Sequence, residues 1–447
     1  MNYLTPDVPE MVDKFFTKFD NIFSEQSQKD NFRFYGTGLL LEIKRKNIQY
    51  MSFHTIGSVY QSEHHFIHDA PWYEQALNNQ RVNTMENIPP TKSCNDGYVI
   101  IDDTGNPKSG SSTFATDRQW IGSLGKVDNG QVVVTTHYAD SRKDWPIDLR
   151  PYMPKKWVEA ENERLCSSVA GRNEIGYVFK TKLQLGLELI DDLKERGIHF
   201  SHLLMDAWYG NSPDFIKGVE YRKHLYITPL YANRRIFCCL FDEPDSVEHN
   251  VKELVTSMEE DAFSRTDYNK ANGEICMAYV AEMKLKIKNL PGKRRVLIVK
   301  PTKEEHDLRK IYVLMSNDFD SEIPLLLAGW SFRDSIDKFY QRSKDELGFD
   351  QYQVRGDRAI RRHWYMAFLM YSYIIFHRQF CSSVGRRNDS GSFRKWCTHT
   401  CYTFGQLLDV IRTKLMLHFQ KWCMDNPGAW HDFLQNEKGI PKSAITA

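Results

Sequence analysis

The chain has 447 residues, of which 41% are hydrophobic and 26% are charged. This length can bury one large core and one or two smaller ones, and the composition argues against disorder throughout. Nine cysteines without a Cys-x-x-Cys pair argue against a disulfide framework and favour a reducing, cytoplasmic setting. The longest apolar run, at residues 365–376, is too short to span a membrane, so we expect no membrane partner.

The formal net charge is only +1, but the charge is unevenly distributed. Residues 351–447 contain 14 Lys and Arg against 6 Asp and Glu, a net charge of +8, which leaves −7 for the rest. An acidic catalytic part with a basic C-terminal part suits a protein that holds a metal in one place and phosphates in another. Uneven surface charge without any partner explains the pattern equally well.

Residues 1–90 are predicted to form a helical N-terminal DNA-binding region. Apolar residues recur at spacings of three and four in Met11–Phe23 and in Gly36–Met51, which predicts two helices. The second range includes the basic cluster of Lys44, Arg45 and Lys46. Short helices with basic connections are typical of helix-turn-helix DNA readers, although a small helical cap on the core would show the same pattern.

Residues 91–230 are predicted to be the first part of an α/β core. Apolar and β-branched runs predict strands at residues 97–101, 131–136, 202–205 and 225–230. A helical pattern over Thr181–Glu195 ends at Gly197, a residue that favours a helix stop.

The remaining chain is predicted in three parts. Residues 231–310 form a β-rich insertion, with strand-like runs at 236–241 and 295–299. Residues 311–380 complete the core with a strand at 311–315 and a helix at 329–347. Residues 381–447 form a helical, basic C-terminal region.

Two of the predicted strands end in an aspartate, at Asp102 and at Asp206. Apolar side chains bury each strand, and its carboxylate emerges where the sheet opens to ligands. Asp103 competes with Asp102 for the first position, but successive strand side chains point to opposite faces, so only one can face a shared metal. Alternation alone does not decide which of the two it is, and Asp103 remains the alternative to Asp102.

A third carboxylate is expected on the helix at residues 329–347. Phe339, Arg342, Glu346 and Gln353 follow one another at spacings of 3, 4 and 7, which places them along one helix face. Taken alone, Arg342 and Glu346 are better explained as an exposed i,i+4 ion pair.

Together these residues resemble the insertion-sequence transposases that carry an Asp-Asp-Glu triad. In that family the first Asp lies in an Asp-x-Thr pattern, as in Asp102-Asp103-Thr104, and the second ends an apolar strand, as Asp206 does. The third acid lies in a Tyr-x₂-Arg-x₃-Glu-x₆-Lys helix signature, which matches Phe339-x₂-Arg342-x₃-Glu346-x₆-Gln353 with Phe for Tyr and Gln for Lys.

The resemblance implies an RNase H-like core, a mixed five-stranded sheet with helices, interrupted by a β-rich insertion before the third acid. It implies that Asp102, Asp206 and Glu346 hold Mg²⁺, with Mn²⁺ as a possible substitute. It also implies a transposase that cuts transposon ends and joins them to target DNA. The expected partners are double-stranded DNA, as terminal inverted repeats and as target, and a second copy in a homodimer.

Two other functions remain open from the sequence. A transposase-derived protein without catalytic activity could bind DNA as a repressor or scaffold, since Phe339 and Gln353 depart from the signature. A plain metal-dependent nuclease of the same fold would cut without joining.

DNA contacts are expected from basic and aromatic side chains close to the acids or on the basic segments. Instead of contacting DNA, the arginines could form an exposed helix face without a partner, and the aromatic residues could pack in the core. The expected contacts are Arg342, Lys126, Trp208, Tyr209, Trp330, Tyr340, Arg355, Arg358, Arg361, Arg362, Lys44, Arg45 and Lys46.

Overall fold

The computed structural model describes residues 9–427, with the exception of residues 56, 168–175, 239–246 and 385–402. The chain divides into two compact units. One, the sheet unit, contains residues 82–343 and 354–357, and the other, the helical unit, contains residues 1–81, 344–353 and 358–447.

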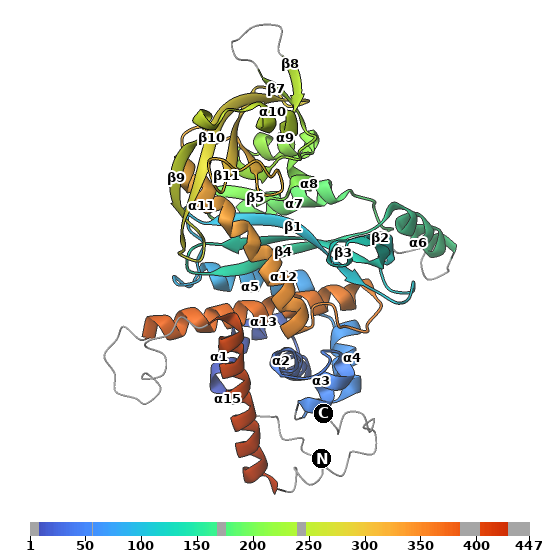
Figure 1. Cartoon of the computed structure of the whole chain (residues 1–447). Helices are drawn as coiled ribbons and strands as arrows, with labels where there is room; N and C mark the ends of the chain where they lie inside the picture. The colour runs from blue at the N-terminus through green and yellow to red at the C-terminus, as the bar shows by residue number, and fades with distance from the viewer. Residues whose placement is uncertain (1–8, 56, 168–175, 239–246, 385–402, 428–447) are drawn as a thin grey trace. The chain divides into compact units, whose positions relative to one another are not determined.

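The sheet unit is built on one sheet of twelve strands (Figure 1). The strands are β1 (Tyr98–Pro107), β2 (Asp117–Ile121), β3 (Lys126–Ala139), β4 (Asp144–Tyr152), β5 (His202–Met205), β6 (Leu225–Pro229), β7 (Arg235–Cys238), β8 (Val247–Asn250), β9 (Ser264–Asn269), β10 (Ile275–Ile287), β11 (Lys293–Lys300) and β12 (Tyr312–Ser316).

Five of these strands lie side by side in the order β4-β3-β1-β5-β6. β1, β3 and β4 are antiparallel neighbours, whereas β5 and β6 run parallel to β1. The central strands are rich in hydrophobic residues, and all four residues of β5 are buried. The predicted mixed α/β class and the strands at 97–101, 131–136, 202–205 and 225–230 are confirmed.

The region from residue 231 to residue 310 extends the same sheet. β12 pairs with β6, and the order then continues β12-β11-β10-β7-β8. β9 pairs with the first residues of β10, from Ile275 to Val280. The region is rich in strands, as its sequence indicates, but its strands share hydrogen bonds with the core sheet through β12.

Helices of the sheet unit connect and cover these strands. α7 (Lys182–Glu195) contacts β3 and β4. The Thr181 side chain caps α7 and Gly197 follows it with φ +67°, as its sequence indicates. The others are α6 (Lys155–Ser167), α8 (Ala207–Gly210), α9 (Pro213–Tyr221), α10 (Val251–Ser257), α11 (Ile323–Trp330) and α12 (Asp334–Leu347), of which α12 continues into the helical unit.

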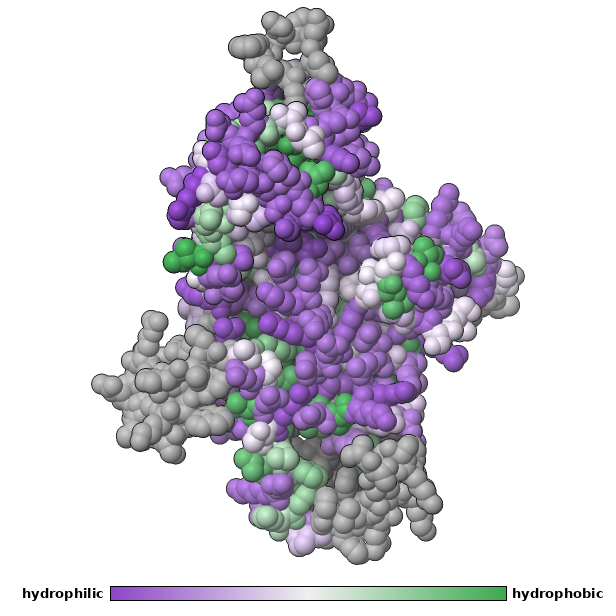
Figure 2. All heavy atoms as spheres, viewed as in Figure 1, coloured by the Kyte–Doolittle hydropathy of each residue, from purple (hydrophilic) through white to green (hydrophobic). Residues whose placement is uncertain are grey.

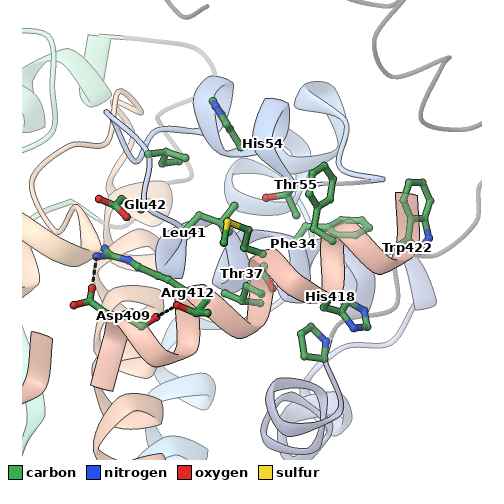
Figure 3. A pocket seen from close by; sticks show the side chains of 16 residues that line it. Phe34, Thr37, Leu41, Glu42, His54, Thr55, Asp409, Arg412, His418 and Trp422 are labelled. Atoms are coloured by element: carbon green, nitrogen blue, oxygen red, sulfur yellow. Dashed lines mark hydrogen bonds and ion pairs between the residues drawn. The ribbon is translucent and has the colours of Figure 1, made fainter. Parts of the chain in front are cut away.

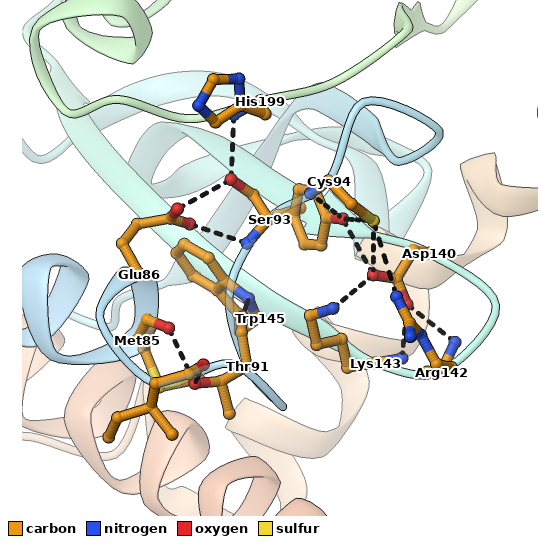
Figure 4. A network of polar contacts seen from close by, with 12 residues as sticks. Met85, Glu86, Thr91, Ser93, Cys94, Asp140, Arg142, Lys143, Trp145 and His199 are labelled. Atoms are coloured by element: carbon orange, nitrogen blue, oxygen red, sulfur yellow. Dashed lines mark hydrogen bonds and ion pairs between the residues drawn. The ribbon is translucent and has the colours of Figure 1, made fainter.

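A buried polar network fixes the segment that leads into β1 (Figure 4). Lys143 forms a 2.5 Å ion pair with Asp140 in the turn between β3 and β4, and both side chains are buried. Tyr138 donates a hydrogen bond to Asp140 and accepts one from the backbone N–H of Cys94. A Cβ at Gly97 would lie 2.3 Å from the Tyr138 hydroxyl, so only glycine fits there. The start of β1 is therefore held in a fixed position.

The helical unit is packed through aromatic side chains. Its helices are α1 (Glu10–Phe16), α2 (Gln26–Leu40), α3 (Ile48–His54), α4 (Tyr60–His68), α13 (Asp357–Val384) and α15 (Phe404–Asp425), and α5 (Glu74–Glu86) begins in this unit. Phe32 contacts Phe16 and Phe23 at centroid distances of 5.0 and 4.8 Å. Tyr35 forms a 2.6 Å hydrogen bond with His363 of α13. The residues predicted as one helix over Gly36–Met51 instead belong to α2, a connection and α3.

The break at residues 41–47 has a physical cause. Asn47 accepts a hydrogen bond from the backbone N–H of Tyr50 and so begins α3. Lys46 is buried and its ammonium donates to the carbonyl of Leu41 at the end of α2. These side chains satisfy backbone groups that a continuous helix would have paired internally. Part of the predicted region 381–447 lies outside the described residues.

Candidate active site

Asp102 and Asp206 lie side by side on adjacent parallel strands. The last paired residues of β1 and β5 are Ile101 and Met205, and each aspartate follows directly. The sequence suggests that the first strand ends at Asp102. In the structure β1 continues past Asp102, because β3 pairs with it as far as Pro107. β5 does end, at Met205, directly before Asp206.

Asp206 is held by the beginning of α8. Its carboxylate accepts hydrogen bonds of 3.0 and 3.1 Å from the backbone N–H groups of Trp208 and Tyr209. α8 lies close against β6, since a Cβ at Gly210 would lie 1.7 Å from the Thr228 hydroxyl oxygen. Burial raises the pKa of Asp206, and these two backbone donors oppose the shift.

Arg333, just before α12, joins Asp102 to a carboxylate of that helix. Its guanidinium forms a 2.5 Å ion pair with Asp102 and a 2.9 Å ion pair with Asp337. Burial raises the pKa of Asp102 to about 7, Arg333 opposes the shift, and the charges of Asp206 and Asp103 add to it. One guanidinium thus balances two carboxylates at the same place.

Asp103 points to the opposite face of β1. It forms a 2.9 Å ion pair with Lys182 of α7, and the Tyr209 hydroxyl lies 3.4 Å from it. Asp102 instead faces Arg333, and its cross-strand partner Thr135 is hydrogen-bonded to Tyr340 of α12 at 2.6 Å. The two neighbouring aspartates therefore face different helices, and Asp102 faces the helix on which the third acid was expected.

Glu346 and Asp337 lie on different faces of α12. Glu346 belongs to the helical unit, where it forms a 2.9 Å ion pair with Arg412 of α15. Nine residues separate it from Asp337, and at about 100° per residue this places the two side chains on opposite faces of α12. Arg333, which contacts Asp102, shares the face of Asp337.

Asp337 and Arg333 are the residues that the sequence analysis missed, although a signal for them is present. Trp330-x₂-Arg333-x₃-Asp337-x₆-Lys344 has the same spacing as the transposase helix signature. It keeps the Arg and the Lys and replaces Tyr by Trp and Glu by Asp. Glu346, nine residues later, offers the glutamate of the signature, but the alignment on Glu346 lacks both the Tyr and the Lys.

The residue types of Asp102, Asp206 and Asp337 suit a hard divalent cation, but their side chains are not gathered as a metal site in this structure. All three offer carboxylate oxygens, which Mg²⁺ and Mn²⁺ prefer. The raised pKa values of Asp102 and Asp206 reflect burial and like charges that a bound cation would offset. Within the described part of the chain, no three His, Cys, Asp or Glu side chains are gathered closely enough to hold a metal ion.

Four of the expected DNA contacts have buried side chains. Tyr209 and Tyr340 are buried beside the acids, and burial raises the pKa of both hydroxyls. Burial lowers the pKa of Lys46 to about 7, and its buried ammonium donates to the carbonyl of Leu41, so it is not presented to a phosphate. Arg362 donates to backbone carbonyls at the end of α4. These positions argue against direct DNA contact.

The other expected contacts are at least partly accessible. Trp208 is 45% exposed next to Asp206, and its ring contacts that of Tyr209. The exposed or half-buried residues are Lys44, Arg45, Lys126, Trp330, Arg342, Arg355, Arg358 and Arg361.

A cavity of about 480 Å³ lies within the helical unit (Figure 3). Its walls come from α2, α3 and α15 and include Phe34, Leu41, Met416 and Trp422. None of the acids of the sheet unit contributes to it. Its lining is mostly apolar, so we do not assign the phosphodiester chemistry to it.

Comparison with known proteins identifies relatives of this chain. The family model described as DDE superfamily endonuclease matches residues 18–248. A curated relative, the "Probable transposase for insertion sequence element IS701" of Microchaete diplosiphon, is 26% identical over 228 residues. The match covers 51% of this chain and 55% of that relative, so the chain spans about half of the relative's length. Of the described residues, no helix is long and apolar enough to cross a membrane.

Among solved structures, the NurA nuclease from Sulfolobus solfataricus is similar at 12% identity, with 58% of this chain and 80% of that chain covered. At a TM-score of 0.25 this similarity supports no conclusion about the fold or function of the chain.

Proposed function

The chain belongs to the DDE superfamily of endonucleases, and from this membership we propose that it is an insertion-sequence transposase that cuts transposon ends and joins them to target DNA. The resemblance to insertion-sequence transposases is confirmed by the family model and by the similarity to a probable transposase. The proposed substrate is double-stranded DNA carrying terminal inverted repeats.

The observation that carries this proposal is the position of three carboxylates in the sheet unit. Asp102 and Asp206 follow the last paired residues of two adjacent parallel strands. Arg333 forms ion pairs with both Asp102 and Asp337. The mixed sheet with the strand order β4-β3-β1-β5-β6 supports the RNase H-like core expected from the resemblance.

We assign the third acidic position to Asp337 in place of Glu346. Asp337 lies on the face of α12 that reaches Asp102 through Arg333, and its helix signature keeps the spacing, the Arg and the Lys of the family. Glu346 lies on the opposite face and is already paired with Arg412. The triad proposed for this chain is therefore Asp102, Asp206 and Asp337.

A divalent magnesium or manganese ion held by these carboxylates would stabilise the negative charge that develops at the phosphate. The backbone N–H groups at the start of α8 fix the carboxylate of Asp206 for this role. Arg333 keeps a positive charge beside the acids, and a guanidinium suits phosphate oxygens. Water cuts the strand at the transposon end, and the 3′-hydroxyl released then attacks a phosphodiester of the target.

A strand-transfer assay tests this proposal. Duplex DNA carrying the inverted repeats that flank the coding region is incubated with the protein and Mg²⁺ or Mn²⁺, together with an unrelated target duplex. The proposal predicts nicked ends and joined products. Cutting without joining would indicate a plain nuclease, and specific binding without cutting would indicate a DNA-binding scaffold. Homodimerisation on two paired ends is part of the proposal and would appear as a complex of two chains with two duplexes.

A further inference from the structure

Arg333 uses both ends of its guanidinium on acids of the proposed triad. One terminal nitrogen, Nη2, forms the 2.5 Å ion pair with Asp102, and the other, Nη1, forms the 2.9 Å ion pair with Asp337. The side chains of Arg333 and Asp102 are only 12% and 13% exposed. Charges shielded from water in this way are weakly screened, so the guanidinium is held on Asp102.

The charge of Arg333 also acts on the remaining acid of the triad. Burial acts to lower the pKa of Arg333, but the charges of the three acids raise it. In turn, Arg333 opposes the rise in the pKa of Asp206 that burial causes. One cationic side chain therefore interacts with the same three carboxylates that a divalent cation would use.

Arg333 holds the oxygen of Asp102 that a metal ion would need. The backbone N–H of Asp103 donates a 2.7 Å hydrogen bond to Oδ1 of Asp102, and Arg333 donates to Oδ2. Mg²⁺ binds an oxygen ligand at about 2.1 Å, so an ion on Oδ2 would lie beside the positive guanidinium and be repelled by it. This contact gives a physical reason why the three acids are not gathered as a metal site.

The guanidinium is not fully satisfied in its position. Within the described residues, its buried Nε–H has no hydrogen-bond partner, and an unpaired buried donor is unfavourable. The carboxylate of Asp337 is 61% exposed, and the surface in view over the region of α12 is largely hydrophilic (Figure 2). Water can therefore screen the charges on this side when the pair opens.

We propose that Arg333 and the divalent cation compete for these acids, so that the guanidinium has to leave Asp102 before its carboxylate can bind an ion. The inference rests on the proposed function, which assigns the cation to Asp102, Asp206 and Asp337. The ion pair between Arg333 and Asp102 then lowers the affinity of the chain for a cation. If about nine-tenths of the molecules hold this pair, the apparent affinity is about tenfold below that of the open form.

Manganese binding by the full chain without DNA tests the competition. Arg333→Met removes the positive charge and keeps an apolar stem. Mn²⁺ is expected to bind this variant at least about tenfold tighter than the unaltered protein, measured from the electron paramagnetic resonance signal of free Mn²⁺. Adding Asp337→Asn to Arg333→Met should abolish the gain, because one of the acids is then lost.

The matched control is Lys182→Met. It removes the ammonium that pairs at 2.9 Å with Asp103, on the other face of β1, and should change the Mn²⁺ affinity by less than about twofold. Unchanged or weaker Mn²⁺ binding by Arg333→Met would overturn the inference, because Arg333 would then support the site. An equal gain in Lys182→Met would also overturn it, because the gain would reflect general charge.

Chemical labelling follows Arg333 in the unaltered protein. Phenylglyoxal reacts with guanidinium groups, and mass spectrometry identifies the arginine that has reacted. Arg333 is expected to react at least about fivefold faster at saturating Mg²⁺ than without divalent cation, because it leaves a nearly buried pair. Arg309, which is exposed, is the internal control and should react equally in both conditions. A rate at Arg333 that Mg²⁺ leaves unchanged or lowers would overturn the inference.

These measurements separate the inference from the proposed function, because neither uses DNA. A protein that cuts and joins DNA but whose Arg333→Met variant binds Mn²⁺ no tighter would refute the competition alone. A protein that neither cuts nor joins DNA, although Arg333→Met binds Mn²⁺ tighter, would refute the proposed function and leave the competition at Asp102 standing.

Discussion

Replacement of Arg362 by Met tests the assignment of this arginine to the interior of the helical unit. Arg362 is 1% exposed and donates to the carbonyls of Phe66, Ile67, Ala70 and Trp72. Its guanidinium also lies 4.3 Å from the centroid of the Trp72 ring. It therefore closes the end of α4 and the turn that follows.

The magnitude of the effect follows from these contacts. A hydrogen bond to a charged group contributes about 1.5–3 kcal/mol, and a buried carbonyl left without a donor costs about 1–3 kcal/mol. Burial lowers the pKa of Arg362 to about 10, so part of this gain is offset by the cost of removing the charge from water. Arg362→Met, which keeps the apolar stem, is expected to destabilise the helical unit by about 3 kcal/mol.

Hydrogen exchange and denaturant unfolding measure this effect. Arg362→Met should lose protection in α4 and at residues 69–72, while Arg358→Met, an exposed position of the same helix, should stay within about 0.5 kcal/mol of the unaltered protein. Unchanged protection in Arg362→Met together with a loss of DNA affinity would refute the reasoning and restore Arg362 as a DNA contact.

Two further substitutions test the candidate site. Gly210→Ala would place a Cβ 1.7 Å from the Thr228 hydroxyl oxygen, so α8 must shift, and we expect the cleavage rate to fall at least about tenfold with a lower melting temperature. The control is Gly122→Ala, because a Cβ at that position meets nothing within 4 Å. Equal activity of the two variants would contradict the close approach of α8 to Thr228. Because the pKa of Asp102 is raised to about 7, its folded form holds a proton that the unfolded chain has lost, so stability falls as pH rises from about 4 to about 7. Asp102→Asn should flatten this part of the melting-temperature profile measured without divalent cation, and an unchanged slope would contradict the shift.

Local patterns were sufficient to predict most of the sheet. The strand at 202–205 and the helix up to Glu195 were recognised because apolar runs and capping residues are local signals. The break between α2 and α3 was missed because it depends on Lys46, a residue whose charge suggests exposure but whose ammonium is held by the carbonyl of Leu41. Contacts of this kind decide where a helix breaks, and they cannot be read from the periodicity of apolar residues in the sequence.

The sequence predicts that Asp102 and Asp206 follow two strands of one sheet, whereas it does not distinguish Asp337 from Glu346 for the proposed third acid. Asp102 and Asp206 are marked by the strands that precede them, and the parallel register of β1 with β5 places them together. Charged residues are frequent along α12. The transposase helix signature can therefore be aligned in two ways, one with Asp337 and one with Glu346, nine residues later, as the acid. Only the contact between Arg333 and Asp102 distinguishes the face of Asp337 from that of Glu346.

The most direct test of the proposed triad compares Asp337→Asn with Glu346→Gln in the strand-cleavage assay with Mg²⁺. Each substitution removes one negative charge and keeps the size of the side chain. The proposed triad predicts that Asp337→Asn lowers the cleavage rate by about a thousandfold or more while duplex binding is retained, because an acid that holds the cation is lost. Glu346→Gln should cut within about fivefold of the unaltered protein and lose stability in the helical unit, because it breaks the pair with Arg412. Full cleavage by Asp337→Asn together with loss of cleavage in Glu346→Gln would contradict the assignment.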